Sequence, residues 1–64
     1  MKLEDYGYNV TSIAKSRHYA LSKAANLNGI KNVLSALRKR KSRASDGSYK
    51  FKRYRADINW LKVR

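Results

Sequence analysis

Positive charge is the feature that most restricts how this chain can fold. It has sixteen Lys and Arg against four Asp and Glu, a formal net charge of +12 in 64 residues. In a folded protein of this size the excess positive charges repel one another. We therefore expect the protein to bind a polyanion or an acidic protein surface. Nucleic acid is the first candidate, because Lys and Arg that neutralise its phosphates release condensed counterions.

Length and residue content limit the chain to one small domain, residues 1–64. A chain this short buries a smaller share of its surface than a larger protein, so its stability is marginal. With no cysteine and a single histidine, His18, it lacks the residues for a disulfide or a structural zinc site. Its apolar content of 42% is nevertheless that of a globular protein, so we expect it to fold rather than to remain a disordered basic tail.

The same content argues against catalysis and against a membrane. The few carboxylates and the lone histidine do not make up a triad, and Gly7, Gly29 and Gly47 are isolated rather than grouped in a phosphate-binding loop. No apolar run approaches the roughly 20 residues that span a bilayer. We predict no enzyme, no cofactor, no metal site, no small-molecule substrate and no membrane contact.

Apolar periodicity predicts a first helix from about residue 12 to residue 28. Five apolar residues recur there at helical steps: Ile13, Ala20, Leu21, Ala24 and Leu27. Thr11 or Ser12 is placed to cap the start, and the Asn28-Gly29 pair is typical of a helix end, because both residues tolerate the left-handed conformation.

A second helix is predicted directly after Gly29. Its apolar residues follow the i, i+3, i+4, i+7 pattern: Ile30, Val33, Leu34 and Leu37. The run from Arg38 to Lys41 then places positive charge in the last turns, where the helix dipole favours it. The short connection between the two helices indicates a helical hairpin or a helix-turn-helix-like corner.

Residues 42–48 are polar and rich in turn formers, so we predict a flexible loop there. A third helix follows, with Asp46 or Ser48 as its cap. One face of it is apolar: Phe51, Tyr54, Ile58 and Leu61. The opposite face carries Trp60, Tyr49 and Val63, which we predict to be a protein interface because a single small domain has little surface to cover both faces.

The predicted fold is therefore all-α. It consists of a helical hairpin, a C-terminal helix and an extended N-terminal segment that lays Tyr6 and Tyr8 across the hairpin as additional core.

Two basic clusters are the strongest chemical signal. The first surrounds the run 38–41, where Arg side chains suit bidentate phosphate contacts and Lys side chains act as point charges. The second, residues 50–55, alternates cations with aromatic rings, as single-strand binding proteins do. The predicted nucleic-acid-binding residues are Lys31, Arg38, Lys39, Arg40, Lys41, Arg43, Lys50, Lys52, Arg53 and Arg55.

Some residues have more than one interpretation. Phe51 and Tyr54 suit either base stacking or the core. Arg17 and His18, in the middle of the first predicted helix, suit a phosphate contact, a polar contact within the hairpin, or an exposed surface without a role.

Several short motifs resemble a group of small basic proteins of nucleocytoplasmic large DNA viruses. The motifs are Leu3-x-x-Tyr6-Gly7-Tyr8, Arg17-His18-x-Ala20-Leu21-x-Lys23-Ala24, Gly29 followed by Val33 and Leu37, and Asp57-x-x-Trp60-Leu61-Lys62. The resemblance implies a virion-associated protein that is made in the host cytoplasm or nucleus. It implies no catalytic or binding residues.

Two functions follow as hypotheses. The first is binding of nucleic acid, DNA rather than RNA, through sequence-independent phosphate contacts that package or condense a genome. The second is a structural role as a minor capsid or virion component, in which the positive charge meets acidic capsid or core proteins and Trp60 docks on a neighbour.

Overall fold

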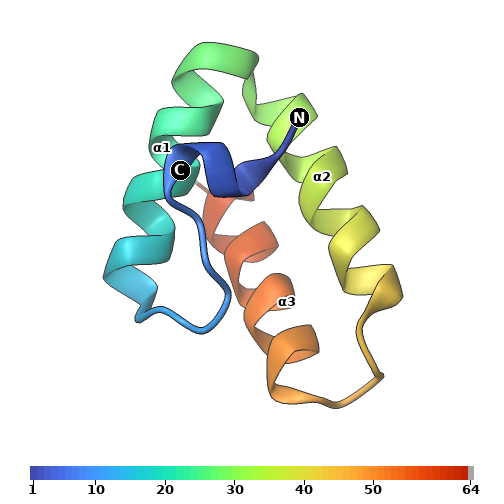
Figure 1. Ribbon diagram of the computed structural model, residues 1–64. Helices are drawn as coiled ribbons and strands as arrows, with labels where there is room; N and C mark the ends of the chain where they lie inside the picture. Colours follow the sequence, from blue (N-terminus) through green and yellow to red (C-terminus); the bar gives the residue numbers. More distant parts are fainter. Residues whose placement is uncertain (64) are drawn as a thin grey trace.

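The computed structural model describes residues 1–63, which form three helices and a short 3-10 turn (Figure 1). The elements are η1 (Leu3–Tyr6), α1 (Ala14–Asn28), α2 (Ile30–Arg43) and α3 (Tyr49–Lys62). The described residues contain no strand, so the predicted all-α fold is confirmed. Each helix runs antiparallel to the next along the chain, and η1 crosses in front of them between α1 and α2 (Figure 1).

The start of α1 differs from the prediction. Neither Thr11 nor Ser12 caps the helix, whose N-cap residue is Ile13 and has no side-chain capping bond. Instead, the backbone N–H and the hydroxyl of Thr11 both donate hydrogen bonds to Asn9 Oδ1, at 2.9 and 2.7 Å. The Ser12 carbonyl accepts a bond of 2.8 Å from the Arg17 guanidinium. Local side-chain bonds therefore hold this turn outside the helix.

The predicted end of α1 is confirmed at Gly29. This glycine has a φ of +87°, in the left-handed region, and its N–H donates to the Ala25 carbonyl at 2.8 Å. A side chain other than glycine is strained at such a φ. Because α2 begins at the next residue, Gly29 turns the chain sharply from one helix into the other.

The boundary between α2 and α3 is partly as predicted. Helix α2 continues through Arg43, so the loop comprises residues 44–48 and the prediction of 42–48 began two residues too early. The hydroxyl of Ser42 donates to the Lys39 carbonyl at 2.8 Å, which satisfies Ser42 within the helix. Ser48 is the cap of α3, and its hydroxyl accepts from the Phe51 N–H at 3.2 Å. The flexibility of the loop stays a prediction.

All four elements contribute to one core. Its buried apolar side chains are Leu3, Tyr8, Ala20, Leu21, Ala24, Ala25, Val33, Leu37, Tyr54, Ile58 and Leu61. The predicted stripe of α3 is confirmed at Tyr54, Ile58 and Leu61, which are buried, whereas Phe51 is only partly buried and lies outside the core. The stripe of α1 is wrong at both ends, because Ile13 and Leu27 are each 69% exposed. In α2, Ile30 is 44% exposed, whereas Leu34 packs against the core.

A buried ion pair explains why α1 presents a different face. Arg17 and Asp57 are 6% and 0% exposed, and the Arg17 Nε–H donates to both carboxylate oxygens at 2.9 and 3.2 Å. Arg17 thus takes a place on the inward face of α1 that the apolar pattern did not assign to it. The face centred on Arg17, Leu21 and Ala24 is turned inward, and Leu27 is left outside.

Tyr8 completes this network. Its hydroxyl donates to Asp57 Oδ2 at 2.6 Å, and its side chain is 2% exposed. Burial, together with the hydrogen bond to Asp57, raises the pKa of Tyr8 far above its usual value. The prediction that Tyr8 joins the core is confirmed. The extended form predicted for this segment is wrong at residues 3–6, which form η1, and Tyr6 is only partly buried.

We predict that Leu21→Ala or Leu37→Ala lowers the free energy of unfolding by about 2 to 4 kcal/mol, because each leaves a cavity in the core. The matched control is Leu27→Ala, which removes the same atoms from an exposed position and should change stability by less than about 0.5 kcal/mol. Denaturant titration followed by circular dichroism measures all three. Equal losses at positions 21 and 27 would contradict the orientation of α1.

We also predict that Asp57→Asn lowers the free energy of unfolding by about 3 to 5 kcal/mol, because it leaves the Arg17 charge buried without a counter-charge. Asp46→Asn, in the exposed loop, should stay within about 0.5 kcal/mol of the parent. The same denaturant titration compares them. A parent-like Asp57→Asn variant would show that the ion pair does not hold the helices together.

Candidate nucleic-acid interface

The ten predicted nucleic-acid-binding residues lie on α2 and α3, but they do not form one surface. Seven are exposed: Lys31, Arg38, Lys39, Arg43, Lys50, Lys52 and Arg55. The other three, Arg40, Lys41 and Arg53, are partly buried and have partners within the protein. The structure therefore divides the set according to what each cation already contacts.

A hollow between the N-terminal residues and α2 gathers part of this set. Its volume is about 410 Å³, and its walls are Met1, Lys2, Asn32, Ser35, Ala36, Lys39, Arg40 and Arg43. Lys39 and Arg43 are four residues apart and so lie on the same side of α2, one turn from each other. Lys2, which the sequence analysis did not single out, supplies a cation from the opposite wall.

A second hollow lies beside the first. It has a volume of about 220 Å³ and is lined by Arg40, Arg43, Ala44, Lys50 and Tyr54. Arg40 and Arg43 line both hollows, so the two are neighbours at the α2–α3 corner. We call the two hollows together the basic groove and define it by its cations, Lys2, Lys39, Arg40, Arg43 and Lys50.

Among residues 1–63, Arg40 is the one groove cation with an acidic partner. Two of its N–H groups donate to the two Glu4 carboxylate oxygens, Nη2 to Oε1 at 2.6 Å. The hydrogen bond to Arg40 lowers the pKa of Glu4 to about 2, and the same bond raises the pKa of Arg40. The pair ties η1 to α2, so a phosphate at Arg40 has to compete with Glu4.

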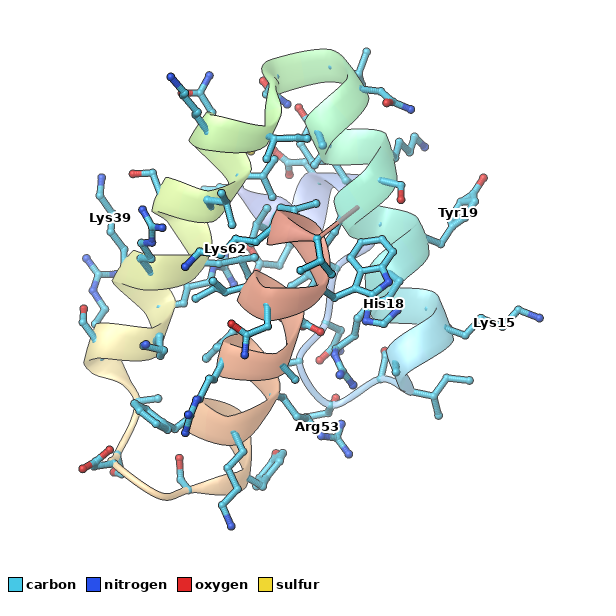
Figure 2. All side chains as sticks on the ribbon, turned by 180° about the vertical axis from the view of Figure 1, so that it is seen from behind. Lys15, His18, Tyr19, Lys39, Arg53 and Lys62 are labelled. Atoms are coloured by element: carbon cyan, nitrogen blue, oxygen red, sulfur yellow. The ribbon has the colours of Figure 1, made fainter. Side chains whose placement is uncertain are left out.

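Arg53 and Lys41 have roles within the fold. The Arg53 guanidinium donates to the carbonyls of Val10 and Ser12 at 2.9 and 3.1 Å, and it lies 5.4 Å from the centre of the Tyr49 ring. The Lys41 ammonium lies 5.5 Å from the centre of the Phe51 ring. Figure 2 shows Arg53 near the start of α3, well apart from Lys39 on the outer side of α2. The rings of Tyr49 and Phe51 therefore each lie beside a cation of the same protein.

The remaining cations do not line the groove. Lys31, Arg38, Lys52 and Arg55 are exposed, and neither hollow includes them. Residue type alone does not distinguish Arg38 from its neighbour Lys39. Only Lys39 lines the groove, because the two side chains lie on different sides of α2.

The predicted protein interface is divided as well. Trp60 is partly buried, and its ring stacks on that of His18 with a centroid distance of 4.0 Å and an interplanar angle of 5°. Tyr49 and Val63 are 54% and 83% exposed. At 1.5 Å per residue, Tyr49 lies about 16 Å along α3 from Trp60. The three residues therefore do not form a single patch.

The stack also bears on the alternatives for Arg17 and His18. His18 Nε2 lies 3.6 Å from Asp57 Oδ1, beside the ion pair of Arg17. Of the three interpretations, the geometry comes nearest to the polar contact, but that contact joins α1 to α3 and does not lie within the hairpin of α1 and α2. The stack of Trp60 on His18 thus lies next to the Arg17–Asp57 pair.

Comparisons with known proteins add no relative. No family model, no curated protein and no solved structure matches the chain. The resemblance to small basic viral proteins stays an expectation from the quoted motifs. Within residues 1–63, no group of His, Cys, Asp and Glu is placed to hold a metal ion, and no helix is long and apolar enough to cross a bilayer.

We predict that Glu4 titrates with a midpoint near pH 2, and that Arg40→Gln returns the midpoint toward the ordinary value of about 4.5. The lowered pKa means that this pair stabilises the fold above about pH 4.5 and that its contribution is lost as the pH falls toward 2. Carboxyl carbon shifts in an NMR titration measure the midpoint. A parent midpoint near 4.5 would show that the pair does not form in solution.

Proposed function

We propose that this protein binds nucleic acid, duplex DNA above all, through sequence-independent phosphate contacts, and that it packages or condenses a genome in this way. The observation that carries the proposal is the basic groove, whose two neighbouring hollows gather cations from the N-terminal segment, α2 and α3.

The groove has the chemistry that phosphate binding needs. Four of the eight residues that line its larger hollow are Lys or Arg, and none of the eight is acidic. Arg offers a planar fork of donors to two phosphate oxygens, and Lys offers a mobile point charge. Asn32 and Ser35 add neutral donors. Contacts of this kind position a protein on the backbone and carry no sequence information.

The charge balance supports the same conclusion. Of the four acidic residues, Asp57 forms an ion pair with Arg17 inside the core, and Glu4 forms one with Arg40 at the groove. Four of the five groove cations have no acidic partner within 4 Å among residues 1–63. Their mutual repulsion is relieved when a polyanion binds.

We predict that the quadruple variant Lys2→Gln, Lys39→Gln, Arg43→Gln and Lys50→Gln flattens the salt dependence of duplex DNA binding. If each cation neutralises one phosphate, the slope of log K against log salt should fall in magnitude by about 3 to 4. Fluorescence anisotropy with a labelled duplex at several salt concentrations measures the slope.

The matched control removes four positive charges outside the groove: Lys31→Gln, Arg38→Gln, Lys52→Gln and Arg55→Gln. It should change the slope by less than about 1, since these residues make no phosphate contact in the proposed complex. Equal flattening by both variants would contradict a localised interface. If the parent protein binds no duplex even at low salt, the alternative of docking on an acidic capsid or core protein replaces the proposal.

A further inference from the structure

The tyrosines differ sharply in what their rings contact. Tyr8 and Tyr54 are buried in the core with ring centroids 6.4 Å apart, and Tyr49 lies beside the Arg53 guanidinium. The other two, Tyr6 and Tyr19, meet in a separate cleft. Tyr19 is 71% exposed, so its ring is accessible to a ligand.

This cleft lies between η1 and α1. Its volume is about 450 Å³, and it is lined by Tyr6, Gly7, Lys15, Ser16, Tyr19 and Ala20. That volume is within the roughly 300 to 1,000 Å³ of small-molecule sites. Two aromatic rings, a glycine and an alanine make its surface largely apolar, while Lys15 and Ser16 add a cation and a hydroxyl.

A hydrogen bond holds the Tyr6 wall of the cleft, whereas the Tyr19 ring on the other wall is exposed. The Tyr6 hydroxyl accepts a bond of 2.7 Å from the Asn28 side-chain amide, which holds the ring at the end of η1. Tyr19 projects from α1 beside Lys15, one turn away on the same face (Figure 2). The exposed Lys23 follows one further turn along this face.

We propose that the cleft between Tyr6 and Tyr19 is a stacking site for an unpaired base of a single-stranded nucleic acid. This inference rests on the proposed function and adds a second class of substrate to it. A base has two π-faces and stacks on aromatic side chains whatever its identity. Lys15, at the same cleft, meets the phosphate attached to that base.

The charge of the surroundings favours this occupant over an apolar peptide. None of the six residues that line the cleft is acidic, and Lys15 and Lys23 flank Tyr19 on α1. Lys2 lines the basic groove and Tyr6 lines the cleft, so the N-terminal segment contributes to both sites. A duplex would thus make phosphate contacts in the groove, whereas a single strand would make the same contacts and also stack a base in the cleft.

The test compares a labelled thymidine 20-mer with a 20-base-pair duplex by fluorescence anisotropy, using parent, Tyr19→Ala and Tyr19→Phe proteins. Stacking is worth about 1 to 3 kcal/mol per base, so Tyr19→Ala should weaken single-strand binding by roughly 5- to 150-fold. Its duplex binding should stay within about twofold, and Tyr19→Phe should restore single-strand binding because the ring remains. Tyr49→Ala, at an exposed tyrosine outside the cleft, is the matched control and should leave both affinities within about twofold.

The outcomes separate this inference from the proposed function. Parent-like single-strand binding by a folded Tyr19→Ala variant would overturn base stacking in the cleft and leave duplex binding through the groove intact. Equal losses for single strand and duplex would also overturn it, since stacking acts on unpaired bases alone. If the parent bound neither oligonucleotide, both proposals would fail. Circular dichroism of each variant confirms that the helices are retained.

Discussion

The buried ion pair of Arg17 and Asp57 is the interaction on which the rest of the structure depends. A carboxylate that is 0% exposed needs both a counter-charge and hydrogen-bond donors, and Arg17 and Tyr8 supply them. Because the three residues come from α1, the N-terminal segment and α3, the pair sets how these parts meet. His18 and Trp60 stack beside it where α1 meets α3. In a protein with so much positive charge, an internal acid of this kind also consumes one cation that would otherwise add to the repulsion.

The second internal pair, Glu4 with Arg40, has a different effect because it lies at the surface. It links η1 to α2 beside the hollow that Lys2, Lys39 and Arg43 line. The acidic residue thus neutralises one cation of the basic groove while it joins the N-terminal segment to α2. Fold and candidate site are therefore not independent, because this ion pair belongs to both.

The sequence predicted the helices better than their orientation. The end of α1 at Gly29 was predicted, and Ser48 was one of the two caps proposed for α3, because glycine at positive φ and serine at an N-cap act through their immediate neighbours. The burial of Ile13 and Leu27 was predicted wrongly, because periodicity assumes that apolar residues alone choose the inward face. Asp57, the one acidic residue of α3, lies among Tyr54, Ile58 and Leu61 on the buried stripe. That position was the signal in the sequence that a buried acidic residue would need a basic partner on another helix.

The sequence by itself determined the local properties of this protein: three helices, the end of α1 at Gly29 and a large surplus of positive charge. Only the tertiary structure decided which cations share a surface and which have internal partners. Lys39 and Arg38 are neighbours in the chain, yet only Lys39 lines the groove, whereas Lys2 and Lys50 come to it from distant segments. The reason is physical. Helix propensity and capping depend on residues a few positions apart, but the pairing of Glu4 with Arg40 across 36 positions depends on how separate elements pack.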